Sequence, residues 1–206
     1  MKVLALEVGM LGTNCYIAVN EADNHGVVID PGADGKYILE AIKKQGLTID
    51  GILLTHGHSD HIGALSEVAE ALKVPVMIGA GDEDKLTSAN SNLSSFMGAG
   101  ITCKAADRLL SDGDVVELAG LKFEVLATPG HTPGGVCFKC GNVVFVGDTI
   151  FAESIGRTDF PGGSYKQLLD SIKTKILTLP DDTKLLPGHG PATDVAWERR
   201  MNPFLQ

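Results

Sequence analysis

Short apolar runs bounded by glycine, proline and asparagine alternate along the chain with segments of helical period. Apolar runs of about four to eight residues, rich in valine, isoleucine and leucine, are typical of strands in a mixed α/β protein. The predicted strands are residues 2–8, 15–19, 26–30, 51–55, 74–78, 114–119, 121–128, 135–139, 142–146 and 184–187. Several of these runs are close enough in sequence to form hairpins.

Other segments carry the period of an amphipathic helix. Residues 35–46, 61–73 and 164–177 place apolar side chains three or four positions apart. Gly46 supplies a stop signal for the first of them, and Ser164 is the predicted N-cap of the third. One more helix is predicted over 194–204, whereas residues 79–106 show no strong period, so part of that segment is predicted to be a long loop.

Two parts of the chain resemble each other. In residues 27–58 and again in residues 143–189, a strand is followed by an aspartate, a loop, a helix, a second strand and a histidine. The likeness predicts two similar halves, each a sheet with helices, packed face to face about a shared site. Chance similarity between two ordinary units of this kind is the alternative.

Composition limits the class of protein. The chain has 206 residues, 44% hydrophobic and 21% charged, which predicts one globular domain over 1–206. A formal charge of -9 disfavours a nucleic-acid partner. No apolar run reaches membrane-spanning length, and the first residues do not form a signal peptide. Four cysteines without an export signal predict reduced thiols and a cytoplasmic location.

Candidate chemistry is concentrated in residues 54–62, "LTHGHSDHI". Three of the six histidines of the chain and one aspartate lie within six consecutive positions there. His131, Asp148 and His189 also come directly after apolar strand-like runs. Because ligands of open α/β sheets gather beyond the carboxyl ends of strands, these side chains are predicted to converge on one site.

The number of donors decides how many ions to expect. Five imidazoles and two carboxylates give seven candidate ligands, whereas one tetrahedral zinc takes about four. Two divalent ions that share a bridging carboxylate account for the surplus. Zinc is the expected metal, and iron or manganese also suit nitrogen and oxygen donors. A proton relay would leave the histidines at the other strand ends unexplained, and His25 is interpreted as an ordinary surface residue.

The motif H-x-H-x-D-H, followed by His131, Asp148 and His189, resembles the metallo-β-lactamase superfamily over nearly the whole chain. The resemblance implies an αββα sandwich with the metals at one edge. It implies one metal held by His56, His58 and His131, a second held by Asp60, His61 and His189, and Asp148 as the bridge. It also implies that Asp30 supports the ligands from behind.

Within that superfamily the chain resembles short, single-domain relatives of glyoxalase II. This resemblance rests on the segments "VVFVGDT" and "FAESIGRTDFPGGS". Only 17 residues follow His189 (206 minus 189), so the helical C-terminal domain with which long forms help bind glutathione is expected to be absent. Arg157 is predicted to contact an anionic part of the substrate or to brace its loop, with a surface ion pair as the alternative. Tyr165 is predicted to line the pocket or to pack its helix.

The resemblance implies hydrolysis of glutathione thioesters such as S-lactoylglutathione, or of related small-molecule thioesters, by a hydroxide that bridges the metals. Asp60 is expected to orient that hydroxide. One alternative is an oxidoreductase resembling the persulfide dioxygenases, which hold a single iron with two histidines and one aspartate. Others are a lactonase, another metallo-hydrolase such as a β-lactamase-like enzyme, or a metal-bound binding module. Oligomeric state is not predicted.

Two weaker motifs are interpreted as structural. Cys137 and Cys140 form a single C-x-x-C within a predicted strand, where residues three apart point to opposite faces, so both thiols are expected to be inert. The glycine-rich segments "HTPGG" and "FPGGS" lack the lysine and helix of a phosphate loop, which disfavours nucleotide binding.

Overall fold

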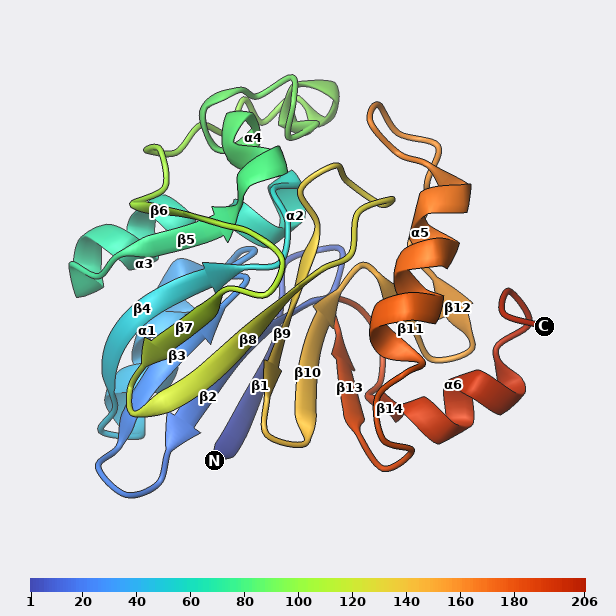
Figure 1. The fold of residues 1–206 in the computed structure, drawn as a ribbon. Helices are drawn as coiled ribbons and strands as arrows, with labels where there is room; N and C mark the ends of the chain where they lie inside the picture. Colours follow the sequence, from blue (N-terminus) through green and yellow to red (C-terminus); the bar gives the residue numbers. More distant parts are fainter.

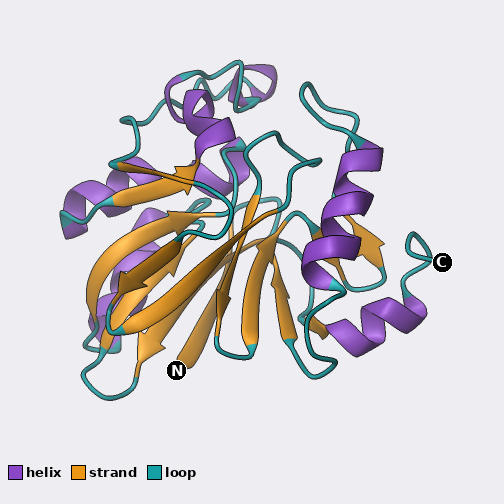
Figure 2. Cartoon of the chain, viewed as in Figure 1, coloured by secondary structure: helices purple, strands orange, loops and turns teal.

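Two six-stranded sheets lie face to face, with helices on their outer sides (Figures 1 and 2). The predicted αββα sandwich is therefore confirmed. This computed structural model describes residues 1–96 and 98–206 with their side chains, and residue 97 through its backbone alone. Within the described residues, no helix is both long and apolar enough to cross a membrane.

The first sheet follows the chain from edge to edge. Its strands pair antiparallel from β1 to β3 and parallel from β3 to β6. They are, in order, β1 (Lys2–Val8), β2 (Thr13–Asn20), β3 (His25–Ile29), β4 (Thr48–Leu54), β5 (Val76–Gly79) and β6 (Arg108–Leu110).

The second sheet has the order β14-β13-β10-β9-β8-β7, and only β10 and β13 pair in parallel. Its strands are β7 (Val115–Leu118), β8 (Leu121–Ala127), β9 (Val136–Cys140), β10 (Val143–Gly147), β13 (Lys184–Pro187) and β14 (Thr193–Asp194). A separate two-stranded ribbon joins β11 (Ile150–Phe151) to β12 (Ser154–Ile155).

Helices cover the outer face of each sheet (Figure 1). The first half of the chain contributes α1 (Gly35–Lys44), α2 (Ser59–Ile62), α3 (Leu65–Leu72), η1 (Ala80–Asp82), α4 (Glu83–Thr87) and η2 (Ser94–Met97). The second half contributes α5 (Tyr165–Ser171), its π-helical continuation η3 (Ile172–Ile176) and α6 (Val195–Met201). Ser164 caps α5 as predicted, since its hydroxyl accepts the backbone N–H of Gln167.

Three buried clusters correspond to the three contacts between the four layers. The largest side chains between the sheets are aromatic, and they come from β8, β9 and β10: Phe123, Phe138 and Phe145. A second cluster joins the first sheet to α1 and α3, and a third joins the second sheet to α5, η3 and α6. Burying both faces of each sheet explains the near-continuous apolar runs in the central strands.

The predicted likeness between the two halves corresponds to matching topology. In the first half, β3 and β4 are parallel neighbours and α1 lies between them in the chain. In the second half, β10 and β13 are parallel neighbours and α5 lies between them. Each first strand ends at an aspartate and each second strand ends near a histidine, so both pairs deliver polar side chains at their carboxyl ends.

The helix predicted over 61–73 is divided into α2 and α3. Gly63 lies against the backbone of Gly32, where an added Cβ would come within 2.3 Å of the carbonyl oxygen. The N–H of Ala64 is bonded to the carbonyl of Pro31. These contacts hold the break in place, so α2 is a separate turn. The segment 79–106 also contains α4 and two 3₁₀ turns, which are too short to give a sequence period.

Candidate metal centre

All seven predicted ligands meet at one edge of the sandwich, beyond the carboxyl ends of four strands. The loop after β4 carries His56 and His58, and α2 carries Asp60 and His61. The other three follow strands of the second sheet, β8, β10 and β13, and are His131, Asp148 and His189. His25 lies apart from them, half exposed at the start of β3, where its Nδ1 contacts Asp50 Oδ1 at 2.8 Å.

The donors fall into overlapping groups whose ligand atoms lie within 4.8 Å of one another. His56, His58 and His131 form one group, and Asp60, His61 and His189 form another. A third group consists of His56, His61 and Asp148. The first two groups correspond to the two sets that the family resemblance implies, and the third joins Asp148 to one histidine from each.

Hydrogen bonds orient the imidazoles so that one ring nitrogen of each faces the other donors. Four of the five rings place Nδ1 beside an acceptor, which leaves Nε2 to face inward. Thr55 Oγ1 lies 3.2 Å from His56 Nδ1, and Asp30 Oδ2 lies 3.0 Å from His61 Nδ1. The carbonyl oxygen of Arg157 lies 2.7 Å from His131 Nδ1, and that of Leu11 lies 3.1 Å from His189 Nδ1.

His58 is oriented the other way. Its Nδ1 lies 2.9 Å from Nε2 of His131. Because His131 Nδ1 donates its proton to the Arg157 carbonyl, a ring with a single N–H has its lone pair on Nε2. A lone pair aimed at a neighbouring ring nitrogen is the arrangement expected where two imidazoles bind one cation.

Several buried polar atoms at this edge lack a hydrogen-bond partner among the described residues. They are His56 Nε2, His61 Nε2, Asp148 Oδ1 and, nearby, Thr132 Oγ1. Buried polar groups are normally hydrogen-bonded, so three buried donor atoms without a hydrogen bond at one place are the arrangement expected of metal ligands. The residues therefore fit a metal centre.

The charge states of three donors, His56, His58 and Asp148, suit metal binding. Burial and the neighbouring His61 lower the pKa of His56 well below its usual value, and burial with His131 lowers the pKa of His58 to about 3. Both rings are thus neutral and can donate lone pairs. Burial alone would raise the pKa of the Asp148 carboxyl, but His61 and the other imidazoles lower it, so this side chain is a carboxylate. Nitrogen and oxygen donors of this kind suit zinc, iron or manganese.

Asp30 lies behind the ligands, as predicted. It is 2% exposed, with a backbone φ of 52°, and it holds two elements at once. Its Oδ1 accepts the N–H of Thr55, and its Oδ2 accepts the Thr55 hydroxyl at 2.6 Å and faces His61 Nδ1. One carboxylate therefore fixes the end of β4 and the tautomer of His61.

Asp82 is a supporting residue that the sequence analysis missed. The side chain is fully buried in η1, where Oδ2 accepts the N–H of Gly57 at 2.9 Å and Oδ1 accepts the N–H of Gly134 at 2.8 Å. Gly57 lies between His56 and His58, and Gly134 lies in the loop that carries His131. Asp82 thus ties together the two loops of one ligand group. It follows a predicted strand closely, as the ligands do, but no motif marks it.

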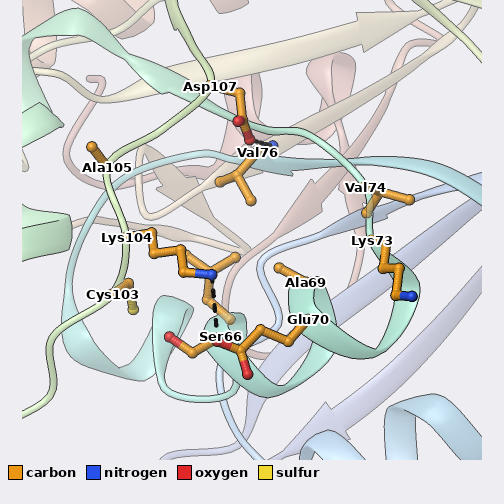
Figure 3. Close-up of a pocket in the computed structure, with 11 residues that line it drawn as sticks. Ser66, Ala69, Glu70, Lys73, Val74, Val76, Cys103, Lys104, Ala105 and Asp107 are labelled. Carbon is orange, nitrogen blue, oxygen red and sulfur yellow. Dashed lines mark hydrogen bonds and ion pairs between the residues drawn. The ribbon is translucent and has the colours of Figure 1, made fainter.

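A cavity of about 840 Å³ opens over the centre. Five of the seven predicted ligands line it: His58, Asp60, His131, Asp148 and His189. In Figure 1, the segment around η2 and the loop before α5 rise on either side of this edge of the sheets. A separate hollow of about 340 Å³ lies between α3 and residues 103–107 (Figure 3), and none of its lining residues is a predicted ligand.

Arg157 and Tyr165, the two predicted substrate contacts, lie differently with respect to the cavity. Arg157 lines the cavity, but its guanidinium forms two 2.8 Å bonds with Asp159 and lies 3.7 Å from the ring centre of Phe160. Its carbonyl also braces His131. Tyr165 is half exposed at the start of α5 and is not among the residues that line the cavity, so its contact with a substrate stays a prediction.

All four cysteines are free thiols, and Cys137 and Cys140 lie on opposite faces of β9 as predicted. Burial raises the pKa of Cys137 to about 11, and its sulfur contacts the hydroxyls of Thr128 and Thr149. We expect Cys137→Ser to keep metal content and activity within about two-fold of wild type, because a serine hydroxyl can use the same partners. Metal analysis with a thiol-release assay tests this, and loss of metal would assign the thiol a role at the centre.

Comparisons with known proteins agree with this geometry. The model of the metallo-beta-lactamase superfamily matches residues 8–189. The probable metallo-hydrolase YqgX of Bacillus subtilis is 42% identical over 100% of this chain and 98% of its own length. Hydroxyacylglutathione hydrolase GloC of Haemophilus influenzae is 36% identical over 100% and 98%.

Two solved structures are also similar. That of BLEG-1 B3 metallo-beta-lactamase has a TM-score of 0.96 with 39% identity over the full length of both chains. That of TTHA1623 in a di-iron-bound form has a TM-score of 0.87 with 38% identity, covering 98% of this chain and 100% of the other. With its fold, its histidine-rich edge and a family match over most of its length, the chain belongs to the metallo-beta-lactamase superfamily.

Proposed function

We propose that this protein is a metal-dependent hydrolase that cleaves acyl thioesters, with glutathione thioesters such as S-lactoylglutathione or related small-molecule thioesters as substrates. The observation that carries the proposal is the pair of ligand groups joined by Asp148 on the floor of a large cavity. The similarity to the hydroxyacylglutathione hydrolase of Haemophilus influenzae supports the thioester class.

Two divalent ions are proposed at the centre, most simply zinc. His56, His58 and His131 would hold one, Asp60, His61 and His189 the other, and Asp148 both. When bound, such ions supply a nucleophilic water at neutral pH and polarise a carbonyl group. Because the similar structure of TTHA1623 is in a di-iron-bound form, iron should be tested alongside zinc.

Asp60 is the proposed catalytic carboxylate. Burial would raise the pKa of its carboxyl, but His61 and His189 lower it, so the side chain is a carboxylate that can accept a hydrogen bond. Its Oδ2 lies 3.1 Å from His189 Nε2 and 3.5 Å from Thr13 Oγ1, which fixes its direction at the cavity wall. In hydrolysis the water oxygen bonds to the acyl carbon, the C–S bond breaks, and the proton lost by the water reaches the leaving thiolate. Asp60 is placed to accept a hydrogen bond from the water and so to orient it.

The test is to count metals per chain and to follow S-lactoylglutathione hydrolysis beside oxygen consumption with glutathione persulfide. We expect two metals per chain, release of thiol and no oxygen uptake. A single iron with oxygen uptake would instead identify a persulfide dioxygenase, the principal alternative. Structural similarity to BLEG-1 favours one further candidate, a β-lactamase, so a chromogenic cephalosporin belongs in the same assay.

A further inference from the structure

The cavity over the metal centre has an apolar wall. Outside the predicted ligands, its lining includes the large side chains of Leu11, Phe96, Phe151, Ile155 and Phe160. Phe160 packs edge-on against His58 at 5.9 Å, and Phe151 lies 6.1 Å from His189, both measured between ring centres. An aromatic ring therefore flanks each of the two ligand groups.

The mouth of the cavity carries the most exposed large apolar side chains in the described part of the chain. Met10 is 103% exposed, Phe96 79% and Leu11 56%. Leu11 and Phe96 line the cavity, and Met10 lies with Leu11 in an adjoining hollow that also reaches Asp60. Apolar groups held in water around an opening are typical of a surface that binds an apolar ligand.

Few lysine or arginine side chains are available in this cavity to bind the carboxylates of a substrate. Arg157 is the one lysine or arginine among the residues that line it, and its guanidinium is already paired with Asp159 through two hydrogen bonds. Lys85 is buried nearby, with its Nζ donating to the Ser91 carbonyl, and it does not line the cavity. Glutathione carries two carboxylates, each of which must lose water to bind and needs a cationic or N–H partner in return.

We infer that the preferred substrates are thioesters with an apolar acyl group and an uncharged thiol, so that glutathione thioesters are accepted but not favoured. The inference rests on the proposed thioester hydrolysis and narrows its substrate class. The acyl chain would lie along Leu11 and Phe96, out of water, while the reacting carbonyl lies over the predicted ligands.

The experiment compares matched thioesters on the metal-loaded protein. Acetyl, hexanoyl and phenylacetyl thioesters of N-acetylcysteamine share one neutral thiol, and lactoyl-N-acetylcysteamine is matched to S-lactoylglutathione. We expect kcat/KM for the hexanoyl thioester to exceed that for the acetyl thioester by about 10-fold or more, because each methylene taken from water adds several-fold. We also expect lactoyl-N-acetylcysteamine to be hydrolysed at least as well as S-lactoylglutathione.

A pair of variants locates the effect. Phe96→Ser should reduce the hexanoyl-to-acetyl ratio of kcat/KM by about five-fold or more, whereas Phe204→Ser, an exposed phenylalanine outside the cavity, should leave the ratio unchanged. Equal rates for acetyl and hexanoyl substrates, or a clear preference for the glutathione thioester, would overturn the inference and leave the proposed hydrolase intact. Failure to cleave any thioester would overturn both.

Discussion

Replacing Asp148 by alanine is expected to remove bound metal and hydrolase activity together. The Asp148 carboxylate reaches both ligand groups: Oδ1 lies 3.3 Å from His61 Nε2, and Oδ2 lies 3.6 Å from His131 Nε2 and 3.7 Å from His189 Nε2. A methyl group offers no ligand atom, so the carboxylate that faces imidazoles of both ligand groups is lost. We expect metal affinity to fall by about 100-fold or more and activity to fall to background.

Competition with a chromophoric chelator measures metal affinity independently of catalysis, and S-lactoylglutathione hydrolysis measures activity. Asp170→Ala is the matched control, because Asp170 pairs with Lys166 on the exposed side of α5 and should be dispensable for both properties. Circular dichroism of both variants checks the fold. A folded Asp148→Ala protein that keeps two metals and full activity would show that Asp148 does not bridge.

Asp82→Asn is expected to weaken metal binding by about 10- to 100-fold although Asp82 is not a ligand. Both carboxylate oxygens accept backbone N–H groups, from Gly57 and Gly134. An amide has one oxygen, so its NH₂ group would face one of these N–H donors and open that loop.

The control for this variant is Asp107→Asn. Asp107 also closes a loop through a single backbone N–H, that of Val76, but it lies beside the hollow in Figure 3. Thermal unfolding in excess chelator reports stability without metal, and chelator competition reports affinity. We expect both variants to lose stability and only Asp82→Asn to lose affinity. Wild-type affinity in a destabilised Asp82→Asn protein would limit Asp82 to a purely structural role.

The layers of the fold could be predicted because they depend on local patterns. Ten strands were predicted from apolar runs and all correspond to strands, since each pairs within a sheet and most are largely buried. The missed strands β6, β11, β12 and β14 have two or three residues each, too few to show a period. The break at Gly63 was missed for a different reason: it depends on Gly32, about thirty positions away in the chain.

The sequence by itself pointed to the superfamily and predicted seven candidate donors, and the family resemblance predicted their division into two groups. This was possible because four of the donors lie within six residues and the others follow strand ends, whose positions are set by the sheets. Tertiary structure alone decided which nitrogen of each imidazole faces inward, because the acceptors come from distant segments such as Leu11 and Arg157. It also decided the role of Asp82 and the apolar wall of the cavity, which side chains from separate loops form only after folding.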